Sequence, residues 1–305
     1  MKKILITGAN GLLGQALLKT FSGEFEILAA DLQEGLALAL AGQSPGGMVH
    51  YQPLDISDPK NCREVVLQNR PDIIINAAAY TNVDGCETDK DLCWKVNVKG
   101  VENLAAAARR NMALVVHIST DYIFDGAEGP YGEDHKPNPL GYYGKSKLAS
   151  ENAVRVAGIP YAIVRTNVLY GAGVNVKNNF FLWVYHSLKS GKTINVVTDQ
   201  WNNPTLAEEL SEGIRLLIEK SKYGVYHIGG KEYLNRFDFA LRIAEVFGFP
   251  RELIRPITTD QLKQEAPRPM RGGVKIERAR SELGFDPRPL KNVLEQLKAR
   301  LEGSV

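Results

Sequence analysis

Short apolar runs alternate with longer amphipathic stretches through the first half of the chain. The apolar runs cover residues 4–6, 27–30, 73–75, 114–116 and 162–164, and their length and composition favour buried strands. Between them, apolar positions recur at helical spacing near residues 12–21, 60–69, 92–110 and 143–157. Strands that alternate with crossover helices build a parallel, doubly wound sheet with helices on both faces, so this pattern predicts an α/β fold.

The alternation of apolar runs and helical patterns becomes irregular after about residue 170. The predicted elements are shorter there and are separated by prolines, at Pro204, Pro250, Pro256, Pro267, Pro269, Pro287 and Pro289. Helical patterns occur near 206–220, 236–247 and 290–301, and residues 225–228 have the composition of a strand. We therefore expect a larger sheet domain over residues 1–170, completed by parts of 200–230, and a smaller C-terminal lobe formed mainly by residues 171–305.

A glycine-rich loop joins the first strand to the first helix. Gly8, Gly11 and Gly14 follow the pattern G-x-x-G-x-x-G, and glycines at such a junction let backbone N–H groups and the helix N-terminus approach a pyrophosphate. Asp31 ends the second strand about 20 residues further on, where a carboxylate can accept hydrogen bonds from the adenosine ribose. The loop predicts a Rossmann-type, dinucleotide-binding first domain, which leaves the second lobe to bind substrate. The expected cofactor contacts here are Gly8, Asn10, Gly11, Leu12, Leu13, Gly14 and Asp31.

Tyr-x-x-x-Lys, a spacing that can serve proton transfer, occurs twice. On a helix, residues i and i+4 share a face, so a lysine ammonium can favour the phenolate of a tyrosine whose pKa would otherwise be near 10. The pair Tyr143 and Lys147 follows a strand that ends in Thr120, whose hydroxyl could polarise a carbonyl at the sheet edge of the glycine loop. The pair at Tyr185 lacks such a hydroxyl, and we expect Tyr185 to pack on a surface helix.

Composition narrows the class of partner. The 37 Lys and Arg residues balance 35 Asp and Glu, which gives a formal net charge of +2 and favours a small or nucleotide-sized partner over nucleic acid or an anionic membrane. The three cysteines form no C-x-x-C pair, and no stretch is long and apolar enough to cross a bilayer, so we expect a cytoplasmic protein. No histidine spacing indicates a metal site, and we expect each of these residues to be an isolated structural one: His50, His117, His135, His186 and His227.

Several segments resemble the short-chain dehydrogenase/reductase superfamily, whose glycine loop has this same spacing. Asp55 and Ile56 resemble the adenine contact of that superfamily, and Asn76-Ala77-Ala78-Ala79 resembles its cofactor wall. Asn97 matches the asparagine that positions the lysine through water. The resemblance therefore adds Asp55, Ile56, Ala77, Ala78, Ala79 and Asn97 to the expected cofactor-binding residues, together with Tyr143 and Lys147.

Almost the whole chain resembles the dTDP-4-dehydrorhamnose reductase family. The motifs are S-T-D-Y-I-F-D-G at 119–126, Y-G-K-S-K at 143–147, R-T-N-V-L-Y-G at 165–171, and the pairs at 199–200, 204–205 and 268–269. The resemblance implies that Thr120 polarises the substrate carbonyl, Tyr143 donates the proton and Lys147 supports it. It also implies substrate contacts at Thr120, Asp121, Tyr122 and Arg268, with Arg268 on the pyrophosphate of the sugar nucleotide. The implied reaction is hydride transfer from NADH or NADPH to C4 of a dTDP-4-keto-6-deoxyhexose, giving dTDP-rhamnose.

Some features depart from the family pattern or leave alternatives open. Val168 stands where relatives commonly have tryptophan, and Asn202 and Asn203 interrupt a D-Q-x-G-x-P-T loop; both segments are expected to face the sugar. No Lys or Arg lies between Lys19 and Lys60, so we expect a preference for NADH over NADPH. The family habit also allows a homodimer and Mg²⁺ at a dimer contact, with no ligand identifiable here.

Two other functions remain open. The chain also resembles the non-catalytic regulatory subunit of methionine adenosyltransferase. A nucleotide-sugar epimerase is the third possibility, although those enzymes have a strand-end motif closer to S-S-x-x-V-Y-G.

Overall fold

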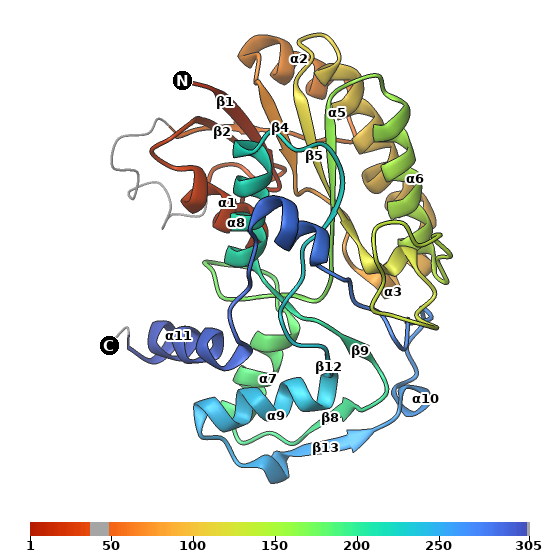
Figure 1. Ribbon diagram of the computed structural model, residues 1–305, viewed down its shortest axis with the longest axis vertical. Helices are drawn as coiled ribbons and strands as arrows, with labels where there is room; N and C mark the ends of the chain where they lie inside the picture. Colours follow the sequence, from red (N-terminus) through yellow and green to blue (C-terminus); the bar gives the residue numbers. More distant parts are fainter. Residues whose placement is uncertain (37–48, 304–305) are drawn as a thin grey trace.

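The computed structural model describes residues 1–36 and 49–303, and within them seven parallel strands form one central sheet (Figure 1). The strand order is β3-β2-β1-β4-β5-β6-β11. The strands are β1 (Lys3–Thr7), β2 (Glu26–Asp31), β3 (Val49–Pro53), β4 (Ile73–Asn76), β5 (Leu114–Thr120), β6 (Tyr161–Thr166) and β11 (Gly224–His227). The α/β prediction is confirmed, and the order reverses between β1 and β4, which is where doubly wound folds bind ligands beyond the carboxyl ends of the strands.

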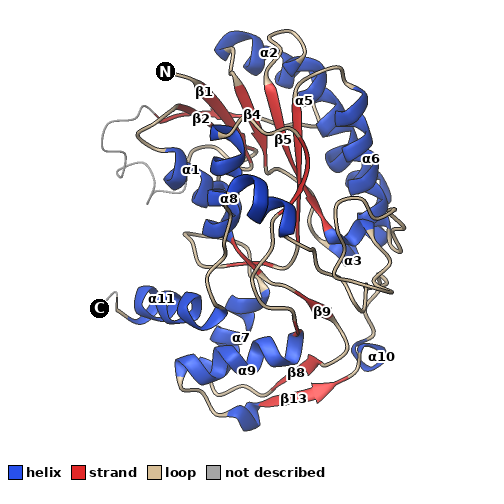
Figure 2. Cartoon of the chain, viewed as in Figure 1, coloured by secondary structure: helices blue, strands red, loops and turns tan. Residues whose placement is uncertain are grey.

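Helices cover both faces of this sheet (Figure 2). One layer contains α2 (Pro59–Asn69), α5 (Gly100–Ala108) and α6 (Tyr142–Val156); the other contains α1 (Leu12–Phe21) and α8 (Ala207–Glu219). The strands β1, β2 and β4 are apolar and almost entirely buried because both of their faces are covered, whereas the edge strand β3 is only partly buried. On β1, Ile4 and Ile6 pack on the side of α1 and α8, whereas Leu5 packs on the side of α2 and α5.

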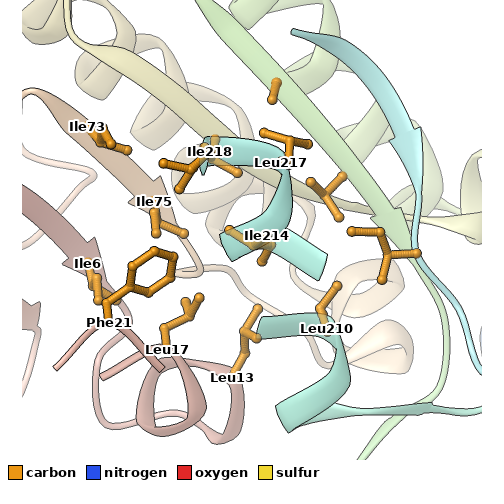
Figure 3. Packing of buried hydrophobic residues seen from close by; sticks show 14 of the residues in the cluster. Ile6, Leu13, Leu17, Phe21, Ile73, Ile75, Leu210, Ile214, Leu217 and Ile218 are labelled. Carbon is orange, nitrogen blue, oxygen red and sulfur yellow. The ribbon is translucent and has the colours of Figure 1, made fainter. Parts of the chain in front are cut away.

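The core between the sheet and the α1–α8 layer explains why these two helices form there. Leu13, Leu17 and Phe21 lie on one face of α1 at helical spacing, and Leu210 and Ile214 lie on the facing side of α8 (Figure 3). All five are buried. The same core takes in residues from the segment 274–285, which the sequence analysis assigned mainly to the second lobe.

A second hydrophobic core lies beyond the carboxyl ends of the sheet strands, in the lower part of Figure 1. Its principal elements are α7 (Phe180–Lys189), β8 (Ile194–Val197), α9 (Arg236–Phe247), β13 (Ile254–Ile257) and α11 (Leu290–Glu302). Short two-residue strands lie alongside: β7 (Leu169–Tyr170), β9 (Trp201–Asn202), β10 (Thr205–Leu206) and β12 (Leu234–Asn235). Shorter helices are α3 (Val83–Thr88), α4 (Lys90–Trp94) and α10 (Thr259–Leu262). In the described part of the chain, no helix has the length and apolar character needed to cross a membrane.

The helix expected near 92–110 is confirmed: α4, a π-helical turn at Lys95–Lys99 and α5 follow one another without a break, with helical backbone at both junctions. The expectation for Tyr185 is corrected. Tyr185 is not a surface residue: its ring packs against Phe181 and Phe247 and is almost completely buried, while its hydroxyl accepts a hydrogen bond from Lys189 Nζ at 2.9 Å. The apolar face of α7 carries this ring into the second core.

Candidate active site

The glycine loop leaves the N-terminus of α1 without a side-chain cap. Gly8 has φ +68°, and a Cβ on it would lie 2.8 Å from the backbone nitrogen of Ala78. A Cβ on Gly14 would lie 2.6 Å from Ala9 Cα, so that glycine lets the helix pack on its own loop. Gly11 occupies the N-cap without a side-chain hydrogen bond, whereas α2, α7 and α9 are capped by Asp or Asn side chains. The first-turn N–H groups of α1 therefore lack a side-chain cap, as a phosphate-binding helix requires.

Asp31 lies at the end of β2 beside this loop. Its Oδ2 accepts from the backbone N–H of Asn10 at 3.0 Å, and its Oδ1 accepts from the backbone N–H of Leu32 at 2.8 Å. These two contacts fix the carboxylate next to the turn, with lone pairs remaining for further donors. The Leu13 side chain is buried in the core, so its contribution to a cofactor site is restricted to its backbone.

The other predicted cofactor contacts lie after neighbouring strands. Ala77, Ala78 and Ala79 follow β4 and pass the glycine loop at Gly8. Asp55 follows β3, and its Oδ1 accepts from the backbone N–H of Ser57 at 2.8 Å. The Ile56 side chain belongs to the buried core, so it is the backbone of this segment that remains at the sheet edge.

Thr120 and Tyr143 meet at the end of β5. Thr120 is its last residue, Tyr143 lies in the first turn of α6, and the Tyr122 ring packs edge-on at 5.7 Å from the Tyr143 ring. Burial raises the pKa of Tyr143 well above its usual value, and the hydrogen bond between its phenol and Thr120 only partly opposes this. The phenol is therefore neutral near pH 7 and has a proton to donate.

Lys147 lies one helical turn after Tyr143 and is buried. Its ammonium donates to the carbonyl oxygen of Ile118 at 2.7 Å and lies 3.5 Å from Nε2 of His117. Burial lowers the pKa of Lys147 to about 8, and the nearby Glu151 opposes that shift. The expectation that His117 is isolated is therefore wrong, since its ring contacts the predicted catalytic lysine.

Asn97 lies behind this group. Its Oδ1 accepts from the backbone N–H of Tyr80 at 2.8 Å, and its Nδ2 donates to the Tyr80 carbonyl and to Ser146 Oγ, each at 3.1 Å. These bonds fasten the segment after Ala79 to α6. The structure thus places the Asn97 side chain between the segment after Ala79 and α6, and among the described residues no hydrogen bond joins it to Lys147 or Tyr143.

Asp121 and Arg268, both predicted to bind substrate, are held by other groups. Asp121 is buried, its Oδ2 accepts from the backbone N–H of Gly273 at 2.8 Å, and burial raises its pKa to about 6. Arg268 forms an ion pair with Asp84 at 2.8 Å. The segment containing Arg268 and Gly273 therefore closes over the end of β5.

Arg236 is a candidate that the sequence analysis missed. It begins α9, its guanidinium lies 4.9 Å from the centre of the Phe180 ring, and it interacts electrostatically with Asp121, Tyr122 and Arg268. Among the described residues it forms no ion pair, and burial lowers its pKa. Arg236 lies at the N-terminal, positive end of the α9 dipole, where a cation is unfavourable. This unfavourable placement is the feature of the sequence that could have identified Arg236 as a candidate site residue.

The residues that depart from the family pattern have different roles. Asn203 Oδ1 accepts from Asn167 Nδ2 and the Val274 N–H, each at 2.9 Å, while its Nδ2 donates to the carbonyls of Gly230 and Val274, each at 3.0 Å. Its amide is thus fully used inside the protein and ties three segments together rather than facing a sugar. Val168 has φ +41°, a strained conformation for a β-branched residue.

Two further observations complete the site. The Oδ1 atom of Asn202 is buried and has no hydrogen-bond partner among the residues that the structure describes. Across residues 1–36 and 49–303, no three His, Cys, Asp or Glu side chains come together as a metal site would require.

A dinucleotide-type glycine loop, a hydroxyl at the end of β5 and a Tyr–Lys pair on α6 together define a Rossmann-fold oxidoreductase of the short-chain dehydrogenase/reductase type. The chain belongs to the family described as RmlD substrate binding domain, whose model matches residues 1–302.

Individual relatives span the chain. A dTDP-4-dehydrorhamnose reductase from Aggregatibacter actinomycetemcomitans is 31% identical over 316 residues, covering 99% of this chain and 100% of its own. A crystal structure of dTDP-4-dehydrorhamnose reductase from Bacillus anthracis in complex with NADP has a TM-score of 0.86 and 34% identity, over 98% of this chain and 100% of that one. Methionine adenosyltransferase 2 subunit beta from Bos taurus is 31% identical over 265 residues, or 84% of this chain and 75% of its own.

Proposed function

We propose that this protein reduces the C4 keto group of a nucleotide-linked 6-deoxyhexose, converting dTDP-4-dehydrorhamnose to dTDP-rhamnose. The observation that carries the proposal is the meeting of a neutral Tyr143 phenol with the Thr120 hydroxyl one helical turn from Lys147. All three lie at the sheet edge that holds the uncapped glycine loop. Relatives of full length are named for this reaction.

Each side chain has a task in such a reduction. The dihydronicotinamide, when bound, supplies the hydride that forms the new C–H bond at C4. Tyr143 gives its proton to the carbonyl oxygen as negative charge develops there, and Thr120 donates a hydrogen bond to the same oxygen. The Lys147 ammonium stabilises the tyrosinate that results, until solvent returns a proton. The carbonyl thereby gains two electrons and one proton with the hydride and a second proton from Tyr143, and becomes an alcohol.

The nucleotide part of the substrate needs cations. Arg236 forms no ion pair among the described residues and has only longer-range electrostatic interactions with groups such as Asp121, whereas Arg268 forms one ion pair, with Asp84. A diphosphate offers oxygens that guanidinium groups bind in a bidentate manner. We place the diphosphate of the sugar nucleotide at these two arginines, next to Tyr122.

A cofactor-oxidation assay across nucleotide-4-keto-sugars tests the function. The purified protein is mixed with NADH or NADPH and with dTDP- or UDP-linked 4-keto-6-deoxyhexoses, and loss of reduced cofactor is followed together with the sugar product. Oxidation that requires a dTDP-4-keto-sugar is the expected result. If no member of the panel is reduced, the proposal is wrong.

We further propose that NADH is preferred to NADPH. Asp31 presents a carboxylate beside the glycine loop, where a ribose 2′-phosphate would meet a like charge. Asp31→Asn keeps the shape and an acceptor for the Asn10 N–H but removes the charge, so the ratio of kcat/KM for NADH over NADPH should fall about tenfold or more. An unchanged ratio, or a parent enzyme that prefers NADPH, would contradict this assignment. Because the Bacillus anthracis relative was crystallised in complex with NADP, kcat/KM has to be measured with both cofactors for this protein.

A second candidate is a non-catalytic regulatory subunit. It is favoured by the 31% identity to methionine adenosyltransferase 2 subunit beta. A regulatory subunit would bind nucleotide without turnover, and it would bind a methionine adenosyltransferase in a pull-down assay. Turnover on the panel decides between the two candidates.

A further inference from the structure

A row of buried polar side chains crosses the sheet to the catalytic helix. Thr7, Asn76 and His117 occupy matching positions on the adjacent strands β1, β4 and β5. Thr7 Oγ1 donates to Asn76 Oδ1 at 2.6 Å, and Asn76 Nδ2 lies 3.2 Å from His117 Nδ1. His117 Nε2 lies 2.8 Å from Ser150 Oγ, which donates to the backbone carbonyl of Lys147 at 2.7 Å. Polar groups so placed in a sheet interior are costly unless every one is paired.

The two ends of this row require the same histidine tautomer. At one end, Thr7 gives its proton to Asn76 Oδ1, so the Asn76 NH₂ group faces Nδ1 and Nδ1 must accept. At the other end, Ser150 gives its proton to the Lys147 carbonyl, so its oxygen must accept from Nε2. These two donor directions point to a neutral His117 with its proton on Nε2.

We propose that His117 is a positioning residue for Lys147, acting by holding an N–H group rather than a lone pair beside the lysine ammonium. The inference rests on the proposed function, because it concerns the same lysine. Nε2 lies 3.5 Å from Nζ, and with its proton in place it cannot accept from the ammonium. The Ile118 carbonyl is then the one hydrogen-bond acceptor that the described residues offer to Nζ. The remaining ammonium protons are left for the cofactor ribose and the Tyr143 side of the site.

The charged and titratable surroundings are consistent with a neutral ring. Burial and the positive charge of Lys147 both lower the pKa of His117 well below its usual value. Around Lys147, Glu151 on α6 and Cys93 on α4 favour the charged ammonium, whereas burial opposes it. Two cations at 3.5 Å in a buried site would repel strongly, and the lowered pKa of His117 makes it the weaker base, so Lys147 carries the positive charge and His117 stays neutral.

Three variants test the role through activity. His117→Phe fills the space but removes both hydrogen bonds, and we expect kcat to fall about tenfold or more because Lys147 loses its alignment. His117→Gln can still donate to Ser150 and should recover part of the loss. Val116→Ala, at the neighbouring buried position of β5, is the matched control and should lower thermal stability without changing the pH profile of kcat/KM.

The pH profile of activity shows in which direction His117 shifts the pKa of Lys147. The Nε2–H group faces the ammonium with its positive end, so removing it in His117→Phe should raise the pKa of Lys147 above its value of about 8. Activity that depends on the ammonium is lost as pH rises through that pKa, and the alkaline limb should therefore move to higher pH. A limb that stays in place would show that His117 only fills space, and one that moves to lower pH would show that Nε2 offers the ammonium a lone pair; either result overturns the proposal.

A measurement that needs no turnover separates this inference from the proposed function. In ¹⁵N-histidine-labelled protein, long-range ¹H–¹⁵N spectra report which ring nitrogen carries the proton, and His117→Gln assigns the signal. We expect His117 to be neutral and protonated on Nε2 from pH 6 to pH 8. A proton on Nδ1, or an imidazolium, overturns the inference even if the enzyme reduces its substrate. If His117 has the expected tautomer but the protein reduces no nucleotide-sugar, the hydrogen-bond row is supported and the proposed function is rejected instead.

Discussion

Replacing Asp121 by asparagine should stabilise the folded protein at neutral pH, because this buried carboxylate is held charged at a cost. Burial raises the pKa of Asp121 to about 6, against a normal value of 3.8. A group whose pKa is raised by folding adds most to stability below its unfolded pKa, and the contribution is lost as pH rises through the folded value. The difference of roughly 2 units corresponds to about 3 kcal/mol between pH 4 and pH 7.

The substitution isolates this effect. In the Asp121→Asn variant the side chain cannot ionise, but its amide oxygen can still accept from the Gly273 N–H. Urea unfolding of both proteins, followed by tryptophan fluorescence from pH 4 to pH 8, gives the difference in their free energies of unfolding. The variant should be more stable by about 1–3 kcal/mol at pH 7.5, and the advantage should vanish near pH 4. A difference that does not change with pH, or a less stable variant at pH 7.5, would refute the reasoning.

The other predictions concern activity and packing. Tyr143→Phe should lower kcat about 10³-fold or more with cofactor affinity retained, as binding and single-turnover assays would show, while Tyr185→Phe should lose one hydrogen bond in the second core and keep kcat. Arg268→Ala should raise KM for the nucleotide-sugar more than for the cofactor, and the reverse pattern would exclude a diphosphate contact. Asn203→Ala should lower the free energy of unfolding by about 3 kcal/mol or more, because four hydrogen bonds are lost and their buried partners remain; a loss below about 1 kcal/mol would contradict that tie.

The parts of the molecule governed by local rules could be read from the sequence. The strands β1, β2, β4, β6 and β11 and the helices α1, α6 and α9 lie within a residue or two of the apolar patterns, because covered parallel strands read as continuous apolar runs. The edge strand β3 has no such run, since its residues are only partly buried, and β5 continues to Thr120, beyond the apolar run at its start. The glycine loop was identifiable for the same reason, since its spacing is set by a turn and a helix start that involve neighbouring residues.

The features that the sequence did not predict depend on contacts between distant segments of the chain. Tyr185 and Tyr143 share one sequence pattern, and only the packing of α7 into the second core shows that Tyr185 is buried there. The role of Asn203 depends on Asn167, Gly230 and Val274, which come from distant segments. His117 falls in an apolar run, and its contact with Lys147 exists only once β5 and α6 are brought together.

Transfer of a labelled hydride tests the central claim most directly. The protein is incubated with dTDP-4-dehydrorhamnose and NADH deuterated at the transferred position of the nicotinamide C4, and the sugar product is analysed by mass spectrometry and NMR. One deuterium at C4 of the product sugar is predicted for the parent, with none detected on the same time scale for Tyr143→Phe. No deuterium in the sugar, or label at a carbon other than C4, would contradict the account.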